Sequence, residues 1–266
     1  MKTHLISPIQ PFFMIHTHKS YQAQHANYNG ISHFYRFTVD DEALAVNVVP
    51  DGSADIIFKL HDDNPEAWIC GSSRKLSNTL IERGCFYFGV RFQIGIMPSF
   101  LPLKPKDIVD QSIPLNLVYV LAGLLIERVA QSQTFEQQIN AFNQVCGTQQ
   151  SSQHIPELSQ RLVQLMLHHR GNISIPELCH HSGYSARTIS SSFNDYYGFS
   201  PKAFNMMLRY QQSLEKLMKN RGGRLTDLAT DVGYADQSHF FRQFKHFNGQ
   251  GPKEFQNTLK QHLIQV

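Results

Sequence analysis

The sequence contains one pattern twice: Phe193–Phe204 reads FNDYYGFSPKAF, and Phe244–Phe255 reads FKHFNGQGPKEF. Both segments follow F-x4-G-x2-P-K-x-F, and they begin 51 residues apart. A duplication of this kind indicates one supersecondary unit that is used twice. The similarity extends upstream, where a leucine and a Gly-Tyr pair occupy matching positions: Leu178 and Gly183-Tyr184, then Leu228 and Gly233-Tyr234.

Each copy has the residues expected of a helix-turn-helix. In the first copy, Ser174 and Glu177 have the spacing of a capping box, and Gly183 can adopt the positive φ that ends a helix. In the second copy, Gly233 makes the turn and Asp236 can cap the following helix. The pattern therefore predicts two helix-turn-helix units in the C-terminal half.

The second helix of each predicted unit has an outer face rich in hydrogen-bond donors. In the second unit, Phe240, Phe244 and Phe247 face inward at helical spacing, so the polar side chains lie opposite. Arg pairs with guanine and Gln with adenine in the major groove, so this face suits DNA recognition. An ordinary solvated face is the alternative, and the duplication argues against it. The candidate DNA-binding residues are Arg187, Ser190, Ser191, Gln237, Ser238, Arg242 and Lys245.

Charge is distributed unevenly along the chain. The 266 residues include 24 Lys and Arg and 21 Asp and Glu, which gives a formal net charge of +3. Residues 1–154 carry −2 and residues 155–266 carry +5. This asymmetry favours a nucleic-acid partner for the C-terminal half. Because the excess is small, we expect binding to depend on dimerisation or on both units together rather than on bulk electrostatics.

The N-terminal half has a β pattern from about residue 34 to residue 100. Short runs rich in Val, Ile, Phe and Tyr alternate with turn residues, which is typical of an antiparallel sandwich or barrel. The fold class is therefore a two-domain α+β protein with an all-α C-terminal domain. The expected strands are Phe34–Val39, Leu44–Val49, Ala54–Leu60, Ala67–Cys70 and Cys85–Gln93.

After about residue 115 the apolar residues recur at the spacing of a helix. A second helical stretch, Phe135–Val145, follows a leucine stripe. Pro156 stands where a first-turn proline would open the next helix. The leucines of the stripe are Leu117, Leu121, Leu124 and Leu125. The predicted divisions are an N-terminal domain over 1–146, a polar linker over 147–155 and a helical domain over 156–266, with helix-turn-helix units at about 174–196 and 224–247.

The duplicated half resembles the DNA-binding domain of the AraC/XylS family of transcriptional regulators, over about Pro156 to Gln256. Arg209, in a long helix expected over Lys202–Asn220, fits the linker-helix arginine of that family. The resemblance implies two recognition helices that enter successive major-groove segments about 34 Å apart. The residues that carry the match are Leu225, Leu228, Ala229, Gly233, Tyr234, Asp236, Ser238, Phe240, Arg242, Phe244, Lys245, Gly249 and Pro252.

The first recognition helix departs from this family pattern. Ser191 and Asn194 stand where the family often has basic residues. We therefore expect the first unit to contact DNA more weakly than the second unit, or to read a different sequence.

The N-terminal half resembles the cupin-like sandwich that precedes many AraC-type domains, through Val49–Phe58, Gly89–Phe92 and Asp107–Leu115. This implies a domain that binds a small-molecule effector; the alternative is one that binds a protein partner or only dimerises. Residues 117–145 form either dimer helices or helices packed on their own sandwich. The implied partners are promoter DNA, a second copy of the chain and RNA polymerase. Candidate effector contacts are Trp68, Tyr87 and Arg91, although aromatic strand residues are more often core.

Other chemistry finds little support in the sequence. His16-Thr17-His18 is the one H-x-H spacing, but it precedes the strands and lacks an evident partner, and Cys179 is expected at a helix core position. The four cysteines form no C-x-x-C pair. The ten-residue apolar run Leu117–Ile126 is shorter than a membrane span. We therefore expect a cytoplasmic, nucleoid-associated protein that is not an enzyme and has no cofactor and no metal.

Overall fold

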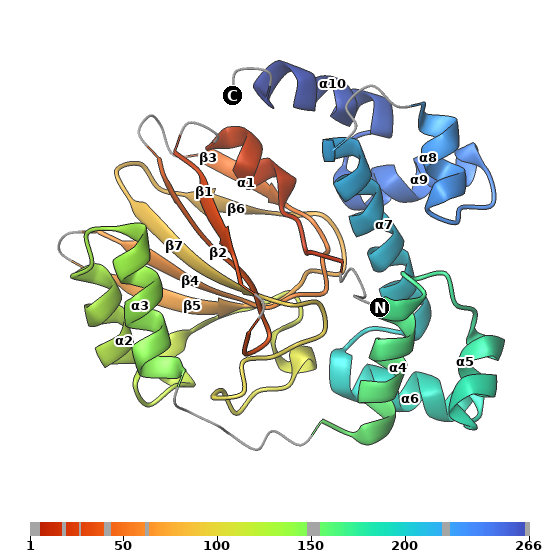
Figure 1. Cartoon of the computed structure of the whole chain (residues 1–266), viewed down its shortest axis with the longest axis horizontal. Helices are drawn as coiled ribbons and strands as arrows, with labels where there is room; N and C mark the ends of the chain where they lie inside the picture. The colour runs from red at the N-terminus through yellow and green to blue at the C-terminus, as the bar shows by residue number, and fades with distance from the viewer. Residues whose placement is uncertain are drawn as a thin grey trace.

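The protein has a β-rich N-terminal half and a helical C-terminal half that lie side by side (Figure 1). The computed structural model describes residues 6–17, 20–26, 28–39, 44–61, 64–147, 155–219 and 224–263. Of the predicted linker, residues 148–154 lie outside the described residues. The expected class, an antiparallel β domain followed by a helical domain, is confirmed.

The strands form two antiparallel sheets. The larger sheet has the order β1-β2-β7-β4-β5-β8, and the smaller sheet pairs β3 with β6. Five strands correspond to the predicted ones, whereas β1, β6 and β8 were not predicted, because their short sequences lack apolar alternation. The strands are β1 Gln22–His25, β2 Ile31–Thr38, β3 Leu44–Val48, β4 Asp55–Leu60, β5 Glu66–Cys70, β6 Ser77–Ile81, β7 Phe86–Phe92 and β8 Ser112–Pro114.

The two faces of the larger sheet have different partners. Successive side chains of a strand point to opposite faces, so Phe88 and Val90 lie on one face and Tyr87 lies on the other. The first face packs against helices α2 (Ala122–Ala130) and α3 (Phe135–Cys146). The second face packs against the β3-β6 sheet and the short helix α1 (Pro11–His16).

The leucine stripe predicted near residue 120 is wrong. Leu117 ends a short 3-10 helix, η2 (Leu115–Leu117), and α2 begins only at Ala122, so the four leucines do not share one continuous helix. Leu125 is fully buried, whereas Leu124 is 44% exposed. The sequence left open whether these helices form a dimer interface or pack on their own sheet. In the structure, α2 and α3 both pack against their own sheet. An interface with a second chain stays a prediction.

The C-terminal half contains both helix-turn-helix units, α5–α6 and α8–α9, joined by the long helix α7 (Figure 1). The expected caps are present: Ser174 Oγ accepts a hydrogen bond from the Glu177 amide, and Gly183 has a φ of 77°. Pro156 is the residue before α4. The helices are α4 Glu157–His168, α5 Ile175–Ser182, α6 Ala186–Tyr197, α7 Pro201–Lys219, α8 Leu225–Asp231, α9 Gln237–Asn248 and α10 Pro252–Leu263.

The two halves share their hydrophobic cores. Ile94 and Val109 of the β domain are buried in the core of the first helix-turn-helix unit, together with Phe193. Tyr210 of α7 belongs to a core that also includes Phe37 of β2. The helical half is therefore packed on the β domain along the length of α7.

The position of α2 predicts different effects for two adjacent leucines. We expect Leu125→Ala to lower the free energy of unfolding by about 2–5 kcal/mol, because it leaves a cavity in the core. Leu124→Ala should lower it by less, because 44% of that side chain is exposed within one chain. Urea denaturation of the two variants makes the comparison. Equal losses would show that Leu124 is as fully buried in solution as Leu125.

Candidate nucleic-acid interface and β-domain cavity

Helix α9 presents a polar face because its opposite face is anchored in the core. Phe240, Phe244 and Phe247 are buried, and the Phe244 ring lies 5.3 Å from that of Tyr210 in α7. The helix begins at a cap in which Asp236 Oδ1 accepts the amide N–H of His239 at 2.7 Å. Packing and cap together fix which side chains face outward. The four predicted residues of this helix are all exposed: Gln237, Ser238, Arg242 and Lys245.

Helix α6 is built in the same way but carries less positive charge. Ile189 and Phe193 are buried, while the predicted residues Arg187, Ser190 and Ser191 are exposed. The Ser191 hydroxyl donates a hydrogen bond to Asp195 Oδ2 at 3.2 Å. The outer surface of α6 thus carries one guanidinium and one carboxylate, whereas that of α9 carries two cations.

Arg209 ties the two units together from the centre of α7. Its Nη1 donates a hydrogen bond to the carbonyl of Gly171, between α4 and α5, at 2.7 Å. Its guanidinium also lies over the ring of Tyr234, in the turn between α8 and α9, at 5.6 Å from the centroid. Burial lowers the pKa of Arg209, and Tyr234 opposes that shift. The arginine matched to the family's linker helix therefore has a structural role here that fixes one unit relative to the other.

The β domain contains two adjoining cavities between its sheets. Arg91 lines a cavity of about 280 Å³, and Trp68 and Tyr87 line a second of about 240 Å³. Tyr35 and Cys70 line both. The three predicted effector contacts thus lie in one connected region, although Tyr87 is also plain core.

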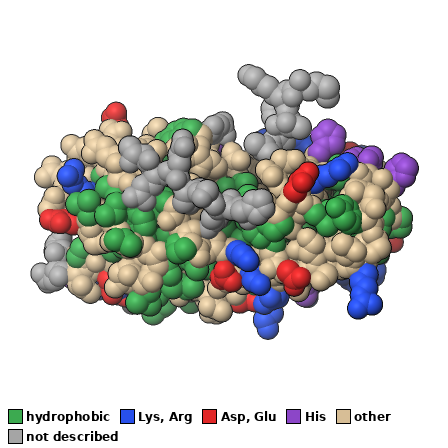
Figure 2. Space-filling model, turned by 90° about the horizontal axis from the view of Figure 1, so that it is seen from below, with side chains coloured by type: hydrophobic (Ala, Val, Ile, Leu, Met, Phe, Trp, Pro, Cys, Tyr) green, Lys and Arg blue, Asp and Glu red, His purple; other side chains and the backbone are tan. Residues whose placement is uncertain are grey.

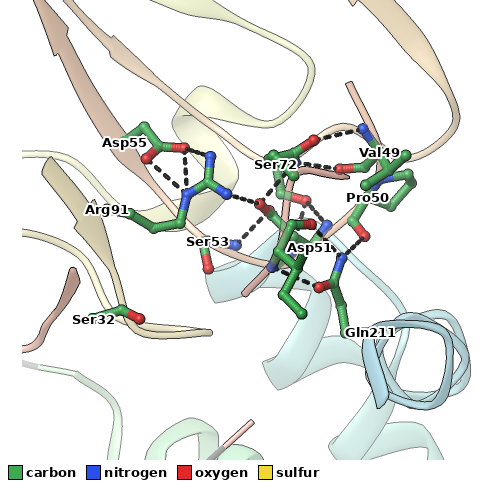
Figure 3. Close-up of polar contacts among 12 residues, drawn as sticks. Ser32, Val49, Pro50, Asp51, Ser53, Asp55, Ser72, Arg91 and Gln211 are labelled. Carbon is green, nitrogen blue, oxygen red and sulfur yellow. Dashed lines mark hydrogen bonds and ion pairs between the residues drawn. The ribbon is translucent and has the colours of Figure 1, made fainter. Parts of the chain in front are cut away.

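Arg91 is held in a buried cluster with two carboxylates (Figure 3). Its Nε donates to Asp55 Oδ1 at 2.9 Å, and its Nη1 lies 3.5 Å from Asp51 Oδ2. Burial raises the pKa of Asp55, and Arg91 opposes that shift. Burial alone would lower the pKa of Arg91, but the two carboxylates outweigh it and raise the pKa above its usual value. Burial and the neighbouring Arg91 together lower the pKa of His33 to about 3, so His33 is neutral at neutral pH.

Asp51 and Asp55 lie on either side of Gly52 in the sequence, but only Asp51 belongs to the turn. Asp51 does form a turn, since its Oδ1 accepts the amide N–H of Ser53 at 3.0 Å. Asp55 lies instead in β4, directly opposite Arg91 of β7. Only the strand order, which places β4 beside β7, brings the charges together. The sequence does place opposite charges at inward positions of two strands. That pattern could predict an ion pair only if the register between β4 and β7 were known.

The same cluster continues to helix α7. Gln10 Nε2 donates to Asp51 Oδ2 at 2.8 Å, and Ser72 Oγ accepts the amide N–H of Gly52 at 2.8 Å. Gln211 of α7 is fully buried and donates to the carbonyl of Pro50 at 2.9 Å (Figure 3). The loop 49–52 therefore lies between the cavity and α7. Sequence reasoning missed Gln10 and Gln211, since neither has a local pattern.

The residues considered for a metal site or a reactive thiol form no such site among the described residues. Cys179, expected in the core, is only partly buried, and His18 lies outside the described residues. Over the described ranges, no three His, Cys, Asp or Glu side chains are grouped so that they could hold a metal ion. Within the same ranges, no helix is both long and apolar enough to cross a membrane.

Two family descriptions match separate parts of the chain. Residues 178–258 match a helix-turn-helix domain, a segment that runs from α5 into α10 and includes both α6 and α9. Residues 24–114 match a domain of unknown function, DUF6597. No curated protein matches the chain.

Several solved structures are similar to this chain. ToxT from Vibrio cholerae has 14% identity and a TM-score of 0.45, with 90% of this chain and 98% of that chain covered. The C-terminal domain of AraT, a response regulator from Geobacillus stearothermophilus, has 20% identity and a TM-score of 0.38, covering 40% and 88%. A probable AraC family transcriptional regulator from Rhodopseudomonas palustris has 24% identity and a TM-score of 0.32, covering 39% and 94%.

Proposed function

We propose, from the premise that this chain is a DNA-binding transcriptional regulator with an AraC-type helix-turn-helix domain, that α6 and α9 read base sequence and that the β-domain cavity binds a small-molecule effector. The observation that carries the DNA-binding part is the duplicated unit, whose two recognition helices keep their polar faces exposed. Arg187, Ser191, Gln237, Ser238 and Arg242 are the proposed base readers, and Ser190 and Lys245 the proposed backbone contacts.

The lining of the larger cavity supports a polar effector that is not an anion. Arg91 would be a natural anchor for an anion, but Asp51 and Asp55 already surround it with two carboxylates. The hydroxyls of Ser53 and Ser73 are buried without a hydrogen-bond partner among the described atoms, so a ligand could satisfy them. Further hydroxyl side chains on this lining are Tyr35, Ser72, Ser77, Thr79 and Ser112. These features favour a small molecule rich in hydroxyl or amino donors over a protein partner.

The route from the cavity to the DNA-binding half runs through Asp51. An effector that contacts Asp51 or Arg91 acts on the loop 49–52, which holds Gln211 of α7. It changes the population of domain arrangements if it binds one arrangement better than another. A regulator of this kind needs no enzymatic step.

Substitution of Arg242 tests base recognition. We expect Arg242→Ala to cost about 1–3 kcal/mol in binding to the preferred sequence and to relax the preference at one base pair. Selection from a randomised duplex library defines that sequence, and fluorescence anisotropy measures the affinities. Arg83→Ala, in the exposed hairpin turn between β6 and β7, is the matched control. An unchanged selected sequence would remove Arg242 from the base readers.

Blocking the cavity tests the effector. Ribitol and ethanolamine should raise the melting temperature of the full chain, because a ligand that binds the folded state stabilises it. The anions ribonate and glycolate should raise it less. Thr79→Trp, at an exposed position on the lining, should abolish the shift, while Gln24→Trp on β1 should keep it. Stabilisation by the anions alone would contradict the proposed polarity.

The exposed apolar side chains around α2 support a homodimer. Leu117 is 73% exposed and Val120 99% exposed, beside the half-exposed Leu124. A second copy would bury these side chains, which are costly to leave in water. We expect Val120→Glu to shift sedimentation equilibrium toward the monomer, and Gln133→Glu in the α2–α3 turn to leave it unchanged. A monomeric wild-type protein would refute this interface.

A further inference from the structure

The weak positive charge of α6 raises the question of what holds this helix on DNA. Non-specific phosphate contacts from Lys and Arg supply much of the affinity of a DNA-binding protein. On α6, Arg187 is offset by Asp195, and both line one groove on the protein surface. On α9, Arg242 and Lys245 have no acidic neighbour within the helix. The first unit therefore needs cations from elsewhere.

A loop of the β domain, residues 104–109, is fixed against the end of α6. Gly198, which ends α6 with a φ of 72°, approaches this loop so closely that a Cβ would lie 2.9 Å from Val109 Cγ2 and 3.0 Å from Lys106 Cα. Val109 is buried in the core of the first unit. Arg74 Nη2 also donates a hydrogen bond to the Gly198 carbonyl at 3.0 Å. The loop consequently has a defined position relative to the recognition helix.

The same loop places a lysine beside the outer face of α6. Lys104 lines the surface groove together with Arg187 and Ser191, two of the proposed base readers. Its backbone is held in place, because the Lys104 amide donates to Asp107 Oδ2 at 2.7 Å and Pro105 follows it. Lys104 and Lys106 are both exposed, and neither has an ion-pair partner in the described part of the chain.

Viewed from below, Lys and Arg side chains project from the surface at several places, some of them beside Asp and Glu side chains (Figure 2). A recognition helix in the major groove, which is about 12 Å wide, has a phosphate backbone along each flank. A cation on the flank of the helix is therefore placed to meet phosphate rather than a base edge.

We infer that Lys104 of the β domain contacts the DNA backbone beside the segment read by α6. The inference rests on the proposed function, since it requires α6 to enter the major groove. The β domain then contributes directly to DNA affinity and supplies the charge that α6 lacks. Lys104 also offsets the carboxylate of Asp195, which would otherwise repel phosphate from the same groove. The DNA-binding surface thus extends beyond the helix-turn-helix domain.

The test measures how the affinity of the full chain for a mixed-sequence 40-base-pair duplex depends on salt. Each lost phosphate contact reduces the slope of log K against log salt by about 0.9 and weakens binding roughly three- to tenfold near physiological salt. We expect this change for Lys104→Ala and a larger loss of affinity for Lys104→Glu. The sequence selected from a randomised library should be unchanged, because the base readers are intact.

The control variants Arg83→Ala and Arg83→Glu carry the same charge changes at a remote position. Arg83 precedes the Phe86 end of β7, whereas Ile94, just past the other end, is buried in the first-unit core. The strand between them spans roughly 20 Å at about 3.3 Å per residue. Their salt slope should equal that of the wild type, and thermal melting confirms that all variants are folded.

Each result has one meaning. A slope for Lys104→Ala equal to that for Arg83→Ala, or tighter binding by Lys104→Ala, overturns the inference and leaves the proposed function intact. A changed selected sequence also overturns it, because a backbone contact does not choose bases. Absence of DNA binding by the wild type refutes the proposed function, and the inference with it.

Discussion

The buried amide of Gln211 is the contact on which the arrangement of the two halves depends. Its Oε1 accepts the amide N–H of Ile9 at 2.8 Å, and its Nε2 donates to the Pro50 carbonyl. A fully buried amide is costly unless both its donor and its acceptor are satisfied. Helix α7 therefore has one favourable position on the β domain. Because α7 also joins the two helix-turn-helix units, that position sets the orientation of both recognition helices relative to the β domain.

The charged cluster next to this contact makes the position of α7 sensitive to what binds in the cavity. Asp51 belongs to the ion cluster of Arg91 and also to the loop that Gln211 holds. Two buried carboxylates share one guanidinium, and removing one partner of such a group destabilises the remaining charges strongly. A ligand that donates hydrogen bonds to this cluster changes how its two carboxylates share the guanidinium. That change takes place beside α7, the helix that joins both DNA-binding units.

Local rules predicted much of the fold. The capping residues Ser174 and Asp236 and the turn at Gly183 follow from chemistry within a few residues, so both helix-turn-helix units could be placed from sequence. The candidate base readers could be named because the buried phenylalanines of α9 fix its opposite face. The leucine stripe failed because periodicity cannot show where a helix begins, and α2 begins only at Ala122.

The sequence by itself determined the two-part architecture, the duplicated unit and the polar faces of α6 and α9, because each depends on spacing along the chain. Tertiary structure alone decided the rest. Asp55 meets Arg91 only through the pairing of β4 with β7, and Gln211 meets Pro50 across 161 residues of sequence. Lys104 lies beside Arg187 only because Val109 is buried in the first-unit core. Such contacts join residues with no shared local pattern, so chain folding must place them.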